Sequence, residues 1–168
     1  MGTTGIYVVM GVSGCGKSTV GEALAAHLGV EFIEGDRVHP PENVARMAAG
    51  IPLTDADRQG WLEALAGHIA DARRAERGLV VSCSALKRRY RDILRSGASD
   101  VRFVFLKGER DLLAARMTER PGHYMPVSLL DSQFAALEEP AADENAWIFD
   151  VAQAPEAIVS ALIARIDG

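Results

Sequence analysis

The chain has 168 residues, of which 48% are hydrophobic; this length suits one domain with a substantial buried core, and the apolar content argues against disorder. The formal net charge is −5, yet ten Lys and Arg residues lie between Ser84 and Met125, which favours a local anion site over a nucleic-acid surface, with a solvated helix face as the alternative. No apolar run is long enough for a signal peptide or a membrane span, and Cys15 and Cys83 stand in no metal-like spacing, so we expect a cytoplasmic protein with no membrane or nucleic-acid partner.

Apolar runs and helical patterns alternate along the chain. The predicted strands are residues 5–11, 30–34, 78–84, 101–107 and 146–151. The predicted helices are residues 17–28, 42–49, 54–76, 87–95, 111–120, 128–137 and 155–166. This alternation predicts an α/β fold, with a five-stranded parallel sheet covered by helices on both faces and ligands at the carboxyl ends of the strands. No repeat or linker divides the chain, so we expect a single domain over residues 1–168.

The strongest motif follows the first predicted strand, where residues 11–18, GVSGCGKS, match the pattern G-x-x-x-x-G-K-[ST] at every required position. Glycines let backbone N–H groups curl around phosphate oxygens, and the following helix adds the partial positive charge of its N-terminus. We expect Lys17 to reach the β- and γ-phosphates of ATP and the Ser18 hydroxyl to ligate Mg²⁺. A glycine-rich turn that matches by accident is the alternative. The predicted ATP-binding residues of this segment are Gly11, Val12, Ser13, Gly14, Cys15, Gly16, Lys17, Ser18 and Thr19.

A glycine loop of this kind fixes the nucleotide but leaves the reaction open. A GTPase needs a guanine-reading N-K-x-D motif after a later strand, which the sequence lacks, and the D-x-x-G match at residues 57–60 falls at a helix start. The chain is also short for the arginine-finger and sensor segments of oligomeric ATPases. A small phosphotransferase remains, and such an enzyme must also bind the acceptor.

Two acidic residues, Glu34 and Asp36, follow the second predicted strand, which we expect to lie next to the strand before the glycine loop. There Asp36 would face an acceptor hydroxyl near the γ-phosphate, where a carboxylate accepts the proton or orients the oxygen. Glu34 is placed to hold a Mg²⁺-bound water. The alternative for Asp36 is a helix cap or an Asx turn, which Pro40 and Pro41 partly support.

Five blocks of sequence together resemble the gluconate kinases of the shikimate-kinase-like P-loop group, and they extend over nearly the whole chain. They are GVSGCGKS (11–18), GDRVHPPENVARMAAGIPLTDADRQGWL (35–62), CSALKRRYRDILR (83–95), VFLKG (104–108) and RPGHYMPVSLLDSQFAALEEP (120–140). The resemblance implies a P-loop fold like that of nucleoside-monophosphate kinases with a small lid at about residues 120–127, a homodimer, and transfer of phosphate from MgATP to the 6-hydroxyl of D-gluconate. Glu34 stands where the family tends to have Asp, and Gly60 where it tends to have Pro; neither change removes a charge, so any effect falls on geometry.

Gluconate is a small carboxylate with a row of hydroxyls, so its site needs cations for the carboxylate and mixed donors and acceptors for the hydroxyls. The residues that supply this mixture are Asp36, His39, Arg46, Arg58 and Lys87, to which the family pattern adds His123 and Gln133. His39 has the alternative of capping its turn, and Arg46 that of a solvated surface residue. Arg88, Arg89 and Arg91 diverge on a helix, so at most two of them can face one ligand.

A pair of arginines, Arg116 and Arg120, lies one helical turn apart ahead of PGHYMP, as in the lids of nucleoside-monophosphate and shikimate kinases. The resemblance implies that Arg116 covers the adenine and that Arg120 closes over the transferring phosphate, where a cation stabilises charge on the equatorial oxygens. A surface pair of arginines is the alternative. Gln153 and Pro155 follow the last predicted strand, where this group of kinases frames the adenine.

The sequence thus predicts a gluconate kinase in which Lys17, Asp36 and Arg120 are catalytic and no covalent intermediate forms. Two other hypotheses stay open: a kinase for another small acceptor, such as shikimate or a nucleoside monophosphate, and a nucleotide-sensing module without useful turnover. The intact Lys17, Ser18, Asp36 and Arg120 argue against the sensing module, because such proteins can lose these groups.

Overall fold

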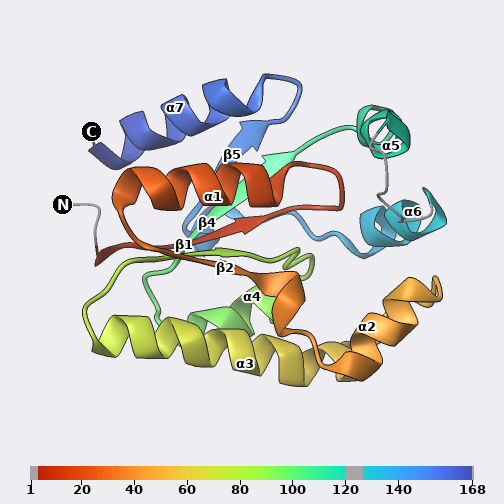
Figure 1. Cartoon of the computed structure of the whole chain (residues 1–168), viewed down its shortest axis with the longest axis horizontal. Coiled ribbons are helices and arrows are strands. Elements are labelled where there is room, and N and C mark those ends of the chain that lie inside the picture. Colours follow the sequence, from red (N-terminus) through yellow and green to blue (C-terminus); the bar gives the residue numbers. More distant parts are fainter. Residues whose placement is uncertain (1–3, 120–126, 168) are drawn as a thin grey trace.

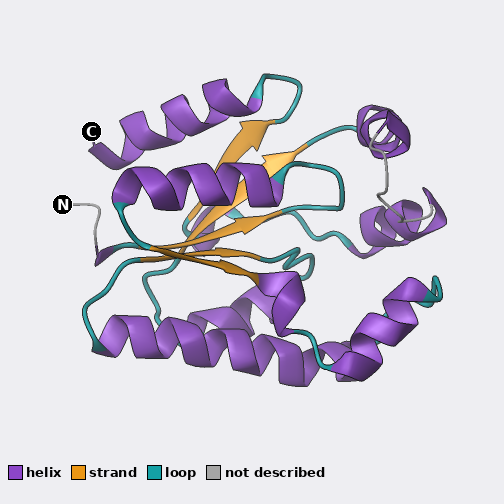
Figure 2. Ribbon diagram, in the orientation of Figure 1, coloured by secondary structure: helices purple, strands orange, loops and turns teal. Residues whose placement is uncertain are grey.

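A five-stranded sheet in which all neighbouring strands are parallel forms the centre of the molecule (Figure 1). The computed structural model describes residues 4–119 and 127–167. Helices cover both faces of the sheet, which confirms the predicted fold class (Figure 2). The strands are β1 (Ile6–Met10), β2 (Glu31–Glu34), β3 (Leu79–Ser82), β4 (Arg102–Lys107) and β5 (Ala146–Asp150).

The strand order is β2-β3-β1-β4-β5, so β3 lies between β1 and β2. Our expectation that the strand bearing Glu34 lies next to the strand before the glycine loop is therefore wrong. Burial explains the order: every residue of β3 is buried, whereas Glu31 of β2 is exposed and the rest of β2 only half-buried, so β2 suits an edge. Glu34 is in register with Ser82, and Ser82 with Val9, so the carboxyl ends of the three strands stay level.

The two faces of the sheet carry separate cores, because successive side chains of a strand point to opposite sides. In β1, Val8 belongs to the core packed against α3 and α4, and Val9 to the core packed against α1 and α7. Figure 1 shows these two pairs of helices on opposite sides of the sheet. Their bounds are α1 (Lys17–Leu28), α3 (Asp55–Arg74), α4 (Arg88–Arg95) and α7 (Pro155–Asp167).

Local signals account for the ends of the long helices. Thr54 Oγ1 accepts a hydrogen bond from the Asp57 N–H at 3.1 Å, and the Asp57 carboxylate accepts one from the Thr54 N–H at 3.0 Å. These two reciprocal hydrogen bonds form a capping box at the N-terminus of α3. Gly29 ends α1 in a left-handed conformation with φ of 68°. In the described part of the chain, no helix has both the length and the apolarity needed to cross a bilayer.

The remaining elements are shorter, and three of them, α2, α5 and α6, lie beyond the carboxyl ends of the strands (Figure 1). Ligands of open α/β sheets bind at this end, so we expect the functional site there. The predicted lid at residues 120–127 falls, except for its last residue, outside the described residues. The bounds are η2 (Gly35–Val38), α2 (Pro41–Ala48), α5 (Arg110–Glu119), α6 (Val127–Ala136) and η3 (Ala142–Glu144), where η marks a 3₁₀ helix.

Candidate active site

The glycine loop runs from β1 into α1, and three of its glycines have backbone conformations that residues with side chains rarely adopt. The angle φ is 147° at Gly11, 82° at Gly14 and 93° at Gly16. A Cβ on Gly11 would lie 2.8 Å from the backbone oxygen of Leu106, so only glycine lets the loop pass this close to β4. The loop brings the first turn of α1, whose N–H groups lack carbonyl partners within the helix, to the carboxyl end of the sheet, as phosphate binding requires.

The Glu34 carboxylate connects β2 with β3 and α1. It accepts hydrogen bonds from Ser18 Oγ at 2.5 Å and from Ser82 Oγ at 2.6 Å, which is how Glu34 reaches the glycine loop across β3. The Lys17 ammonium donates to the Val12 carbonyl at 3.2 Å. Hydroxyl and carboxylate oxygens of this kind suit Mg²⁺. No cluster of three or more His, Cys, Asp or Glu side chains in the described ranges could hold a metal by itself, so the ion would also need phosphate oxygens.

The segment after β2 is fixed to the body of the protein at Gly35. A Cβ there would lie 2.0 Å from the Ser82 carbonyl oxygen, so only glycine fits, and Trp61 Nε1 donates to the Gly35 carbonyl at 2.8 Å. Asp36 follows and is exposed. It caps neither η2 nor α2, because the residue before α2 is Pro40 and no side-chain cap is made at either helix. The helix-cap alternative for Asp36 therefore does not hold.

His39 is only 8% exposed, and its ring stacks on Trp61 with 3.8 Å between ring centroids. Its Nδ1 atom lies 3.3 Å from Nδ2 of Asn43 in the first turns of α2. Burial lowers the pKa of the imidazole, and the charge of Asp36 opposes that shift only in part. These contacts show His39 supporting its turn as a neutral ring, and its contact with substrate stays a prediction.

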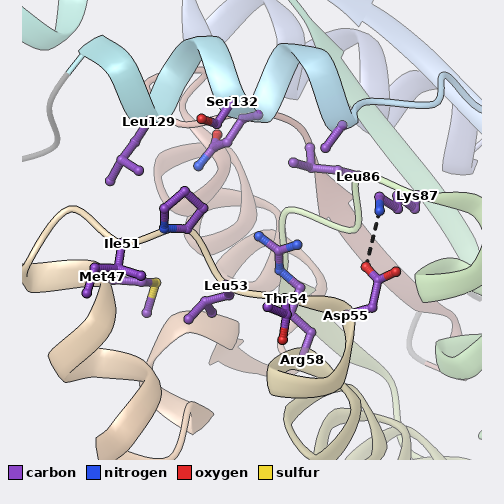
Figure 3. Close-up of a pocket in the computed structure, with 13 residues that line it drawn as sticks. Met47, Ile51, Leu53, Thr54, Asp55, Arg58, Leu86, Lys87, Leu129 and Ser132 are labelled. Carbon is purple, nitrogen blue, oxygen red and sulfur yellow. Dashed lines mark hydrogen bonds and ion pairs between the residues drawn. The ribbon is translucent and has the colours of Figure 1, made fainter.

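A cavity of about 320 Å³ opens between α2, α3 and α6; we call it the acceptor pocket (Figure 3). Three of the predicted acceptor residues, Arg58, Lys87 and Gln133, line it. The Gln133 amide oxygen accepts from the Ser13 N–H at 2.7 Å and its amide nitrogen donates to Ser13 Oγ at 3.0 Å, so the pocket adjoins the glycine loop. The other described lining residues are Met47, Ile51, Pro52, Leu53, Thr54, Asp55, Leu86, Leu129, Ser132 and Ala136.

Four residues predicted to bind the acceptor are not among the described residues of this lining. Arg46 is exposed and forms an ion pair with Asp57, the capping residue of α3. Asp36 and His39 belong to the segment between β2 and α2. His123 lies outside the described residues, as does Arg120 of the predicted lid.

A second cavity, of about 400 Å³, is bordered by the glycine loop and by the start of α7. Arg116, Gln153 and Pro155, which were predicted to contact the adenine, line this cavity together, and Arg116 Nη2 donates to the Val151 carbonyl at 2.7 Å. Burial raises the pKa of the Cys15 thiol, so this residue lines the cavity as a neutral group. The other described lining residues are Gly14, Gly16, Thr19, Val20, Val151 and Ile158.

Sequence reasoning missed two residues of the acceptor pocket region, Asp55 and Tyr90. Lys87 Nζ donates to the Asp55 carboxylate at 3.1 Å (Figure 3), and the Tyr90 hydroxyl also donates to it. Arg58 Nη1 in turn donates to the Tyr90 hydroxyl at 3.0 Å. The available signal was the position of both residues inside the blocks 35–62 and 83–95 that carry the family resemblance.

Three of the four arginines of α4, Arg88, Arg89 and Arg91, diverge, as expected from their spacing. Arg88 forms a surface ion pair, and Arg91 is fully buried in an ion pair with Glu144. Arg89 donates to Asp55 at 2.9 Å and so approaches the acceptor pocket through that carboxylate.

The parallel sheet, the glycine loop and the adjoining pocket define the class of the protein, a P-loop kinase for a small acceptor. The family model described as shikimate kinase matches residues 13–167. At 16% identity, the fold alone is shared with the APS kinase CysC of Mycobacterium tuberculosis, with a TM-score of 0.70 over 99% of each chain.

Similarity to gluconokinases is much closer. The thermosensitive gluconokinase of Escherichia coli K12 is 49% identical over 140 residues, which cover 83% of this chain and 74% of that protein. The gluconokinase of Gluconobacter oxydans 621H is 46% identical over 156 residues, 93% of this chain and 88% of that one. The crystal structure of a gluconokinase from Sinorhizobium meliloti 1021 matches with a TM-score of 0.90 at 50% identity, over 98% of this chain and 93% of that chain. This chain belongs to the gluconokinase family.

Proposed function

We propose that this chain transfers the γ-phosphoryl group of ATP, with Mg²⁺, to the 6-hydroxyl of D-gluconate and releases 6-phospho-D-gluconate and ADP. The observation that carries the proposal is the acceptor pocket, whose cations Arg58 and Lys87 suit a small carboxylate. Gln133 joins that pocket to the glycine loop, so donor and acceptor sites are neighbours. The gluconokinase names of its relatives support gluconate as the acceptor.

The transfer itself depends on positioning and charge, because phosphoryl transfer spreads negative charge over three equatorial oxygens. Lys17 and the N–H groups at the start of α1 bind the β- and γ-phosphates. Ser18 would hold Mg²⁺ with Glu34 behind it, and the ion supplies charge neutralisation at the phosphates. Asp36 accepts the proton of the 6-hydroxyl or orients its oxygen. Arg120 adds positive charge from the proposed lid.

Assembly, domain organisation and location are proposed on the resemblance and the composition. A single domain carries both substrates, two copies form a homodimer, and the protein works in the cytoplasm. Light scattering of the purified protein tests the dimer, and fractionation of cells tests the location.

The acceptor is tested by coupled measurement of ADP release with MgATP and a panel of gluconate, other aldonates, shikimate and nucleoside monophosphates. We expect turnover with gluconate far above background. Turnover confined to another acceptor would refute the substrate, and binding of ATP without turnover would favour a sensing module.

The role of Asp36 is tested by Asp36→Asn, which keeps the size of the side chain and removes its basicity. We expect kcat to fall by about a hundredfold or more, the scale of a lost general base. The matched control is Glu42→Gln, which removes an exposed negative charge from the first turn of α2 and should leave kcat unchanged. A normal kcat for Asp36→Asn would reject the catalytic role.

A further inference from the structure

Asp55, the first residue of α3, lines the acceptor pocket but takes no part in the phosphoryl transfer proposed above. Its side chain is 34% exposed. A carboxylate is unexpected in a pocket for an anionic acceptor, because like charges repel and an acid next to bound gluconate weakens its binding. Its presence therefore calls for a physical reason.

Donors from three residues converge on this carboxylate. Lys87 Nζ donates at 3.1 Å and Arg89 Nη1 at 2.9 Å, and the Tyr90 hydroxyl donates to the same oxygen as Lys87. The two cations of the pocket lining, Arg58 and Lys87, also lie near the Tyr90 ring, with Arg58 Cζ 5.4 Å and Lys87 Nζ 5.7 Å from the ring centroid. Asp55 thus interacts with Lys87 directly and with Arg58 through the Tyr90 hydroxyl.

The charges of the described lining residues sum to a single positive charge, since Arg58 and Lys87 are opposed by Asp55. Arg89 also pairs with Asp55, but it lies outside this lining and is 61% exposed, so water screens its charge. Asp55 is ionised at neutral pH, because hydrogen bonds from Tyr90 and Lys87 lower the pKa of its carboxyl. Two unopposed cations would suit a doubly charged ligand, such as a phosphate ester with its charge of about −2. One net positive charge matches a monocarboxylate.

We propose that Asp55 sets the charge of the acceptor pocket, so that the pocket selects a singly charged sugar acid over neutral polyols and over dianions. This inference rests on the proposed function and names the feature that turns a P-loop kinase away from phosphorylated acceptors. It makes Asp55 a residue that determines specificity without any bond to the acceptor.

The test is a series of three six-carbon ligands of rising charge, D-glucitol, D-gluconate and D-glucarate, bound to the full-length protein and measured by calorimetry. Removal of one unit charge about 6 Å from the ligand, at an effective dielectric constant of about 40, changes the affinity for a ligand by roughly tenfold for each unit of charge that the ligand carries. We therefore expect Asp55→Asn to raise the affinity relative to that for glucitol by about tenfold for gluconate and by about a hundredfold for glucarate.

Two matched variants separate charge from shape. Tyr90→Phe breaks the hydroxyl link between Asp55 and Arg58 but keeps every pocket charge, so it should alter the three affinities by a common factor. Lys87→Gln removes a cation and should shift the ratio of glucarate to glucitol affinity in the opposite direction to Asp55→Asn.

The inference is overturned if Asp55→Asn changes all three affinities equally, or if Tyr90→Phe reproduces its shift in the affinity ratio. Failure of the proposed function has a different signature, because wild-type protein would then show no gluconate-dependent ADP release. Normal turnover with gluconate and an unshifted affinity ratio would reject the role of Asp55 alone.

Discussion

Glu144 and Arg91 form a buried ion pair beneath the loop that supplies Lys87 to the acceptor pocket, and we expect Glu144→Gln to destabilise the protein strongly. The two side chains are 1% and 0% exposed. Arg91 Nε and Nη2 donate to the two carboxylate oxygens at 2.6 and 3.1 Å, and Arg91 Nη1 donates to the Ala85 carbonyl at 2.9 Å. Loss of the carboxylate leaves the guanidinium buried without a full counter-charge.

Two independent estimates of the stability lost in Glu144→Gln agree. Breaking a buried ion pair by removal of one partner costs about 3–5 kcal/mol. Burial would raise the pKa of Glu144, but donors on Arg91, Ala141 and Arg95 outweigh it and lower the pKa from 4.5 to about 2, which corresponds to about 3 kcal/mol of stability at neutral pH. For a domain of this size, a loss of about 3 kcal/mol lowers Tm by roughly 6–12 °C.

The pH dependence has a definite sign, because the pKa of Glu144 is lower in the folded state than in the unfolded chain. Its contribution is complete above about pH 4.5 and is lost as the pH falls toward 2. We therefore expect the difference in the free energy of unfolding between wild type and Glu144→Gln, measured in urea, to become smaller as the pH falls from 7 to 3.

The control is Asp92→Asn, which removes a carboxylate that accepts from Arg95 at 2.7 Å but is 59% exposed. A surface pair of this kind contributes less than about 1 kcal/mol, so this variant should unfold near the wild-type midpoint. The reasoning is refuted if Glu144→Gln is as stable as this control, or if its loss in free energy of unfolding relative to wild type stays constant with pH.

Two further predictions concern the site. Glu34→Gln replaces the carboxylate that accepts a hydrogen bond from Ser18 with a neutral amide. The Mg²⁺ concentration for half-maximal activity should therefore rise by about 10-fold to 100-fold at fixed ATP. An unchanged Mg²⁺ requirement would contradict a metal-supporting role. Gln133→Ala removes two hydrogen bonds between the acceptor pocket and Ser13 of the glycine loop, each worth about 1 kcal/mol. Loss of this link should raise KM for gluconate by up to about thirtyfold in steady-state assays. Ser132→Ala, a change at the neighbouring position in the same pocket, should leave that KM near the wild-type value.

The parts of the fold that the sequence predicted correctly depend on residues close together in the chain. The alternation of strands and helices, the glycine loop of residues 11–18 and the helix start near Thr54 each depend on a few neighbouring positions. Torsional preferences and capping hydrogen bonds act over that range, so they can be inferred without a structure.

The parts that sequence reasoning missed depend on contacts between distant residues. The order of β2 and β3 reflects which strand has two buried faces, and β2 by itself gives only a weak pattern. Asp55 and Lys87 are separated by 32 positions, and Glu34 and Ser82 by 48. Single residues of this kind carry no periodicity, so nothing in their local sequence states which partner they meet.

In the segment GDRVHPP (residues 35–41), the contacts distinguish residues that hold the chain in place from residues whose side chains are available for chemistry. Gly35 is fixed at one end by its approach to Ser82 and by the hydrogen bond from Trp61, and at the other end the ring of His39 stacks on the same Trp61. The prolines that follow start α2 and are not among the described residues that line the acceptor pocket. Asp36 lies exposed between these two anchors and its side chain caps neither η2 nor α2, so the side chain is available to solvent and ligands, and its role as a base for the acceptor hydroxyl stays a prediction.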